Sequence, residues 1–172
     1  MAVHVRAYAP DDWDALVEIH DAARLDELGS SVGIEAFKDL QSTYESEELF
    51  AGDVWVAELD GQVAGFLALS DDEVTWTYVH PRSYRRGVGT ALLRHVTDGS
   101  TRRLELTVLD GNDAARRLYE RAGFVVAETR TGPLVGNEAF TATGHIMCRE
   151  GASISGRSSD PGVAPHHASS GR

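Results

Sequence analysis

The chain has 172 residues, of which 42% are hydrophobic, and it carries a formal net charge of −11 and a single cysteine. This composition fits one soluble globular domain: no apolar run approaches the roughly 18 residues that a membrane span needs, and the acidic balance argues against a nucleic-acid or anionic-membrane surface. One cysteine excludes an internal disulfide, and the first residues lack the apolar core of a signal peptide, so we expect a cytoplasmic protein.

Strand and helix patterns alternate along the first half of the chain. The predicted strands, which are rich in β-branched or aromatic residues, span residues 3–7, 54–59, 62–69 and 73–79. The pair Asp60-Gly61 favours a tight turn, so the second and third of these strands should form a hairpin. Between the first two strands we expect two helices, one capped by Asp11 and one over about residues 34–46.

The second half is predicted to contain two further helices and three strands. Leu92 and Leu93 give the first of these helices its apolar face before Gly99 ends it, and the second helix runs from a cap at Asn112 to Gly123. The three strands are expected at residues 103–109, 124–129 and 140–149. A loop over residues 131–140 should join the last two strands.

The end of the chain differs in composition from the rest. Residues 151–172 are rich in Ser, Gly and Pro and have almost no apolar side chains, so they cannot bury enough surface to offset chain entropy. We therefore predict a folded domain over residues 1–150 and a disordered tail over residues 151–172. The pair His166-His167 in the tail is too short for a metal site, and we expect no metal.

A basic glycine turn lies between the fourth predicted strand and the next helix. Gly87 and Gly89 have no side chain, so their N–H groups can approach an anion closely, and the helix start adds unpaired N–H groups and the positive end of its dipole. Positive charge gathers here at Arg82, Arg85 and Arg86. The pattern indicates a diphosphate-binding turn, although Gly-x-Gly before a helix is also common as a plain tight turn. No Gly-Lys-Ser/Thr follows, which excludes a Walker loop.

A second motif, NDAARRLYERAGF, occupies residues 112–124. In this order and separation the two motifs resemble those of the GNAT superfamily, the acyl-CoA-dependent N-acyltransferases. In that family the glycine turn follows Gln/Arg-x-x-Gly-x-Gly/Ala, and a later helix follows Asn-x-x-Ala-x-x-Leu-Tyr-x-x-x-Gly-Phe. The resemblance covers residues 3–149. One departure is Tyr84, which stands where the family usually has Gln or Arg.

The resemblance implies an α/β (α+β mixed) fold: a mixed, mostly antiparallel sheet with helices on both faces and two splayed parallel central strands. It also implies acetyl-CoA as the acyl donor, bound along the strand before the glycine turn and at the turn itself. The cofactor-binding residues that it implies are Tyr78, Val79, Arg85, Arg86, Gly87, Val88, Gly89, Thr90 and Asn112. Asn112 can contact the cofactor, cap its helix, or do both.

Two residues are candidates for proton transfer. The resemblance assigns Tyr119 as the acid that protonates the departing thiolate, since a phenol with a pKa of about 10 stays protonated at neutral pH; its ring could instead be structural only. Glu73 falls where some protein-acetylating members place a catalytic glutamate, with Glu105 or water alone as alternative bases. Under simple alternation, the strand face that carries Glu73 also carries Thr75, Thr77 and Val79.

We therefore predict an N-acetyltransferase that moves an acetyl group from acetyl-CoA to a primary amine of a small molecule or protein, by direct attack in a ternary complex. The backbone N–H near Val79 is the expected oxyanion donor. A non-catalytic acyl-CoA-binding sensor is the alternative, which Tyr84 favours and Tyr119 opposes. The expected partner is a small-molecule or peptide amine, with no nucleic acid and no membrane, and the chain could be a monomer or a homodimer. The sequence does not identify the amine.

Overall fold

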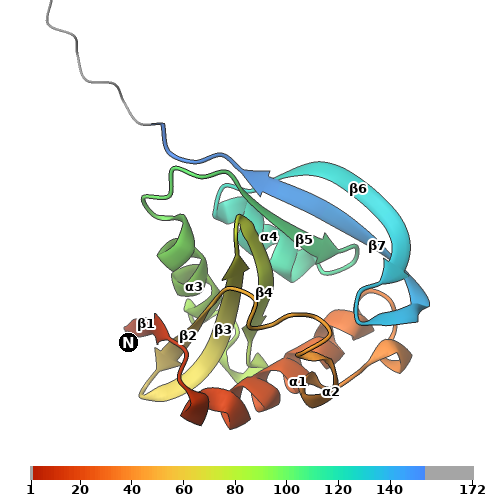
Figure 1. Ribbon diagram of the computed structural model, residues 1–172, viewed down its shortest axis with the longest axis horizontal. Helices are drawn as coiled ribbons and strands as arrows, with labels where there is room; N and C mark the ends of the chain where they lie inside the picture. The colour runs from red at the N-terminus through yellow and green to blue at the C-terminus, as the bar shows by residue number, and fades with distance from the viewer. Residues whose placement is uncertain (1, 154–172) are drawn as a thin grey trace, which may run out of the picture.

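A seven-stranded sheet runs through the computed structural model, which describes residues 2–153 (Figure 1). Its strands are β1 (Val3–Ala7), β2 (Asp53–Leu59), β3 (Gln62–Ser70), β4 (Glu73–Val79), β5 (Leu104–Leu109), β6 (Val125–Leu134) and β7 (Asn137–Arg149), in the order β1-β2-β3-β4-β5-β7-β6. Neighbouring strands are antiparallel except β4 and β5, which are parallel. This arrangement confirms the predicted fold class.

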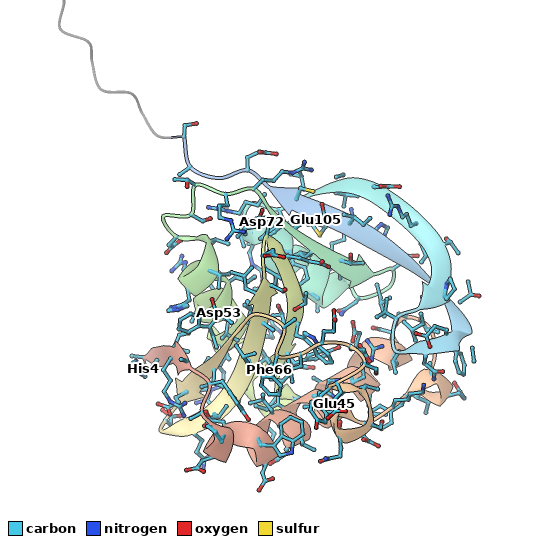
Figure 2. The ribbon with its side chains drawn as sticks, in the orientation of Figure 1. His4, Glu45, Asp53, Phe66, Asp72 and Glu105 are labelled. Carbon is cyan, nitrogen blue, oxygen red and sulfur yellow. The ribbon has the colours of Figure 1, made fainter. Side chains whose placement is uncertain are left out.

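Helices cover both faces of the sheet. The helices are α1 (Trp13–Gly29), α2 (Leu40–Thr43), α3 (Val88–Thr97) and α4 (Asp113–Arg121), with short 3-10 turns η1 (Pro10–Asp12), η2 (Ile34–Ala36) and η3 (Pro81–Ser83). Leu16 of α1 and Phe66 of β3 belong to the core on one face of the sheet (Phe66 is labelled in Figure 2). Leu92 of α3 and Tyr119 of α4 belong to a second core on the other face. No helix among residues 2–153 is long and apolar enough to cross a membrane.

The predicted hairpin, the strand at residues 73–79, the helix after the glycine turn and the helix of the second motif are confirmed to within a residue or two. The predicted tail begins at Gly151, and from residue 154 onward it lies outside the described residues.

The predicted helix over residues 34–46 is wrong. Only η2 and the single turn of α2 form, because Phe37 is extended between them with ψ 134°. Asp39 caps α2 from an extended backbone conformation, and the carboxylate of Asp21 accepts the Leu40 N–H at 2.9 Å. These side chains satisfy the donors at the start of α2 and place a helix boundary inside the predicted span.

The start of α1 also differs from the prediction, because Asp11 does not cap it. The buried Asp12 occupies the cap position, and its side chain accepts the backbone N–H of Ala9 at 2.8 Å. The same carboxylate accepts two hydrogen bonds from the guanidinium of Arg6, at 2.8 and 2.9 Å, which hold the pKa of Asp12 below its usual range. This charged pair fastens β1 to the beginning of α1.

The last hairpin is longer than predicted, and the predicted loop over residues 131–140 is wrong. β6 and β7 continue through most of that segment and leave only Val135-Gly136 as a turn. The tip of the hairpin packs against the region between α1 and α2: Asn137 Nδ2 donates to the carbonyl of Ala36 at 3.0 Å, and Leu134 is buried with Leu28. These contacts support the long hairpin, which arches away from α4 in Figure 1.

Candidate active site

The sheet opens between β4 and β5. Their one registered pair is Glu73 with Glu105, at the beginnings of the two strands, where the Glu105 N–H donates to the carbonyl of Asp72 at 2.9 Å. Asp72 and Glu105 lie close together at this end of the sheet (Figure 2). Beyond this point the strands separate, so the predicted splay of two parallel central strands is confirmed.

Backbone groups of β4 point into this gap. The His80 N–H donates to the carbonyl of Ala64 in β3 at 2.9 Å. Because successive residues of a strand direct their N–H and C=O groups to opposite sides, those of Val79 and Thr77 face away from β3 and toward β5. With β5 displaced, these groups are available to a bound molecule.

Two hydroxyl groups meet on the α4 side of the gap. The Thr77 hydroxyl is buried, and it has no hydrogen-bond partner of good geometry among residues 2–153. It approaches the Tyr119 hydroxyl closely enough to lower the pKa of that phenol, but burial outweighs this effect and raises the pKa of Tyr119 to about 12. Since a buried hydroxyl without a partner is costly, Thr77 marks a position where a ligand atom would be stabilising.

A β-bulge in β4 moves Glu73 to the other side of the sheet. Val74 and Trp76 pair with consecutive residues of β3, which leaves Thr75 as an extra residue. As a result Val74 lies in the core beneath α3, whereas Trp76 lies in the core beneath α1. The prediction that Glu73 and Thr77 share one face is therefore wrong: Glu73 lies on the α1 face and Thr77 on the α4 face.

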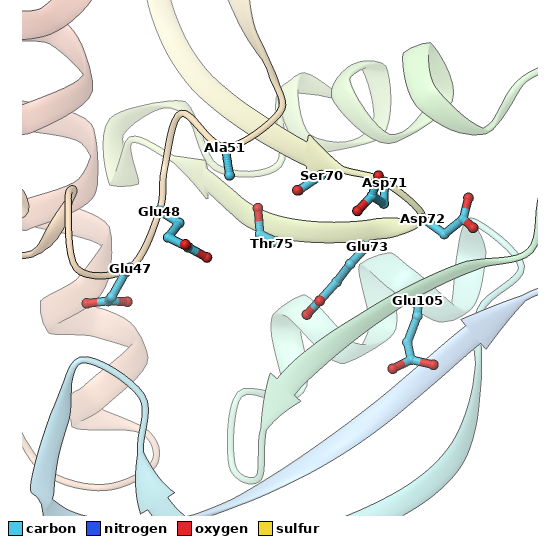
Figure 3. Close-up of a pocket in the computed structure, with 9 residues that line it drawn as sticks. All are labelled: Glu47, Glu48, Ala51, Ser70, Asp71, Asp72, Glu73, Thr75 and Glu105. Atoms are coloured by element: carbon cyan, nitrogen blue, oxygen red, sulfur yellow. The ribbon is translucent and has the colours of Figure 1, made fainter.

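An acidic cavity opens on the α1 face at the beginnings of β4 and β5 (Figure 3). Its volume is about 360 Å³, and it is lined by Glu47, Glu48, Ala51, Ser70, Asp71, Asp72, Glu73, Thr75 and Glu105. Six of these nine residues are carboxylates. Arg102 forms an ion pair with Asp72 and so offsets part of that charge. The remaining charge makes the cavity suitable for a cation.

Sequence reasoning missed Glu47. Burial raises the pKa of Glu47, and Arg24 and Thr43 oppose that effect. Its carboxylate lies against Gly136 at the turn between β6 and β7. Glu47 therefore joins the segment after α2 to the tip of the last hairpin, at one side of the cavity. Only the folded position of that hairpin reveals this role.

The side chain of Tyr78, a predicted cofactor residue, points away from the α4 side. Its hydroxyl donates to Glu27 Oε2 at 3.0 Å, and Arg24 donates to the same oxygen at 2.7 Å. Burial raises the pKa of Tyr78 well above its usual value. Its ring packs with His20 of α1, with centroids 4.9 Å apart. The backbone N–H and C=O of Tyr78 face β3, so neither its side chain nor its main-chain polar groups point into the gap, and the predicted cofactor contact from Tyr78 is not supported.

The two glycines of the basic turn have different roles. Gly87 precedes α3 with φ +84°, and an added Cβ would meet nothing within 4 Å, so its backbone is open to a ligand. Gly89 is buried, and an added Cβ would lie 2.8 Å from Leu118 Cδ2 of α4. Gly87 fits the predicted anion cradle, whereas Gly89 lets the two helices pack closely. Val88 and Thr90 belong to the first turn of α3, whose N–H groups have no intrahelical partner.

The arginines of this turn also tie it to its neighbours. Arg86 Nη2 lies 2.9 Å from Asp60 Oδ2, and Arg82 Nη2 lies 2.6 Å from Glu18 Oε1. Arg85 has a left-handed backbone with φ +61°. Part of the charge predicted for the cradle is thus neutralised by these carboxylates. Asn112 accepts the Ala115 N–H at 3.3 Å, which confirms its role as the cap of α4.

The chain is similar in sequence and in fold to known proteins. A family model described as an acetyltransferase (GNAT) domain matches residues 51–126. The chain is 30% identical over 125 residues to the uncharacterized N-acetyltransferase YafP of Escherichia coli (strain K12), covering 71% of this chain and 81% of that protein. It is 32% identical over 75 residues to the peptidyl-lysine N-acetyltransferase YiaC of the same organism, covering 43% and 51%. The structure of yncA from Salmonella typhimurium, solved with its cofactor acetyl-CoA, gives a TM-score of 0.64 at 21% identity and covers 93% of this chain and 100% of that chain.

Proposed function

Because this chain belongs to the GNAT superfamily of acetyltransferases, we propose that it transfers the acetyl group of acetyl-CoA to a primary amine by direct attack in a ternary complex. The main support is the gap between β4 and β5. There the buried Thr77 hydroxyl, which has no partner of good geometry among residues 2–153, meets the protonated phenol of Tyr119 on the α4 side, and the Val79 N–H faces the same gap. A thioester placed in this gap would meet donors on one side and the acidic cavity on the other.

Acetyl-CoA would supply an activated acetyl group and a thiolate leaving group. We propose that Gly87 and the first turn of α3, from Val88 to Thr90, hold the diphosphate through backbone N–H groups, with charge from Arg85 and Arg86. The backbone of Val79 would position the arm that carries the thioester, next to the cap of α4 at Asn112.

The Val79 N–H is proposed to stabilise negative charge on the carbonyl oxygen, since it faces the gap. Tyr119 holds its proton at neutral pH because burial raises its pKa to about 12. Complete transfer to a thiolate, whose conjugate acid has a pKa of about 8.5, is therefore uphill. We propose that Tyr119 donates a hydrogen bond that stabilises the developing charge on sulfur. The thiolate is then neutralised by the proton that the amine loses.

The cavity favours an acceptor that carries more than one positive charge. Its carboxylates attract an ammonium group but also raise the pKa of that group, so the amine needs a base at the point of attack. We propose Glu73 as this base, with Glu105 as its neighbour; its proton transfer would run through water, because Val79 lies about 20 Å further along β4. A lysine in a basic peptide and an oligoamine both fit, and the similarity to a peptidyl-lysine N-acetyltransferase supports the first.

The glycine turn can be tested by comparing two glycines of similar conformation. Gly87 and Gly99 have φ +84° and +74°, and neither has an atom within 4 Å of an added Cβ. Gly87→Val and Gly99→Val should therefore lose similar stability through backbone strain. Acetyl-CoA at about 100 times its Kd should stabilise wild type and Gly99→Val by about 2.7 kcal/mol, and Gly87→Val much less, in thermal melts. Equal stabilisation of both variants would exclude the turn as the diphosphate site.

Tyr119→Phe keeps the ring and removes the donor. Turnover should fall by roughly 10²–10⁴ with little change in acetyl-CoA affinity, because a positioned donor acts mainly in the transition state. Tyr44→Phe is the control, since the Tyr44 hydroxyl bonds only to the exposed Glu45 among the described residues. Steady-state kinetics and melting curves check both variants. A Tyr119→Phe enzyme with near wild-type turnover would exclude Tyr119 as a catalytic hydrogen-bond donor.

The acceptor class is tested with amines of equal length. We expect 1,5-diaminopentane to give a higher kcat/KM than pentylamine, and the advantage to shrink with added salt. Glu48→Gln should reduce the kcat/KM ratio of the diamine to the monoamine by about threefold, which corresponds to the loss of one exposed ion pair. Glu35→Gln, which lies away from the cavity, should leave this ratio unchanged. CoA release measures each rate. Equal kcat/KM for the two amines would contradict the cationic acceptor and leave the acetyl transfer standing.

A further inference from the structure

A hydroxyl, an imidazole and a carboxylate form a hydrogen-bonded chain on the last hairpin, outside the candidate active site. Thr129 Oγ1 of β6 lies 2.8 Å from His145 Nδ1 of β7, and His145 Nε2 lies 3.0 Å from Asp110 Oδ1 after β5. We propose that this is an acyl-accepting site, at which the Thr129 hydroxyl attacks a small activated ester or thioester and becomes O-acylated.

A second β-bulge creates this pairing. The register advances by two residues on β6, from Val126 to Glu128, while it advances by one on β7, so Ala127 is the extra residue. Without the bulge, Glu128 would pair with His145. The bulge places Thr129 opposite His145 instead. A carboxylate there would make the imidazole part of an ion pair, whereas a hydroxyl leaves it able to act as a base.

Asp110 determines which ring nitrogen is the base. As a carboxylate it only accepts hydrogen bonds, so His145 carries its proton on Nε2 and presents an unprotonated Nδ1 to Thr129. The Asp110 backbone N–H donates to the carbonyl of Thr143 at 2.8 Å, which fixes the carboxylate beside the ring. The His145 side chain is only 12% exposed, while Thr129 is exposed. The base is therefore held in place and the nucleophile is accessible.

The proposed step conserves atoms and charge. The Thr129 oxygen forms a bond to the acyl carbon, and the bond from that carbon to the leaving group, a thiolate, alkoxide or aryloxide, breaks. His145 Nδ1 accepts the hydroxyl proton and donates it to the leaving group. The product is an ester on Thr129, with the imidazole neutral again.

A purely structural role for the same three residues, in stabilising the hairpin, is the alternative. A neighbouring pair of threonines serves to distinguish the two roles. Thr131 lies one step along the same strand face, is also exposed, and bonds to the hydroxyl of Thr143 at 2.7 Å. It thus has a similar hydroxyl in a similar environment without an imidazole. Thr131 is the internal control for intrinsic threonine reactivity.

The test treats the full-length protein with p-nitrophenyl acetate and locates acetyl groups by peptide mass spectrometry. We expect acetylation of Thr129 to be roughly 10² times faster than that of Thr131, the low end of the effect of a positioned base. His145→Gln should abolish this advantage, Asp110→Asn should reduce it, and Thr129→Ser should retain it. Thr131→Val should leave labelling of Thr129 unchanged.

Equal labelling of Thr129 and Thr131, or labelling of Thr129 that persists in His145→Gln, would overturn the proposal. Melting curves identify variants that fail to fold, and Thr129→Ser keeps the test valid because it preserves the hydroxyl. The aryl ester does not require the acetyl-CoA site. The outcome is therefore independent of whether this chain acetylates amines.

Discussion

The early end of pairing between β4 and β5 is the constraint on which the site depends. Most buried backbone N–H and C=O groups in folded proteins have a partner. After the pair Glu73 and Glu105, β4 retains only β3 as a neighbour, so its groups at Thr77 and Val79 face an opening. The Thr77 hydroxyl, which has no hydrogen-bond partner of good geometry among residues 2–153, is a further group that a ligand could satisfy. The opening is thus suited to a polar, extended ligand.

The bulge at Thr75 gives the opening two different sides. It places Glu73 beside the acidic cavity on the α1 face, while Thr77 and Tyr119 remain on the α4 face. A base and a hydrogen-bond donor on opposite faces suit a reaction in which an amine approaches an acyl group from one side and the leaving group departs on the other. A single regular strand would have put both functions on one face.

Local signals predicted most of the fold and part of the site. The Asp60-Gly61 turn, the basic glycine turn and the Asn112 cap are short-range features, and each is found where the sequence placed it. Features set by distant contacts were missed. The capping contact from Asp21 breaks the helix expected at residues 34–46, and packing of Leu134 and Asn137 extends the last hairpin. The β-bulges at Thr75 and Ala127 have no clear local signature, so the face of Glu73 and the pairing of Thr129 with His145 required the register of the strands.

Residue-specific amide exchange, followed by NMR with and without CoA, tests the central claim most directly. In the free protein the Val79 N–H should exchange faster than the N–H groups of Tyr78 and His80, which face β3. Saturating CoA should slow exchange at Val79 and leave Tyr78 nearly unchanged, because only Val79 faces the gap. Slow exchange at Val79 without ligand, or no change there on binding, would contradict the account.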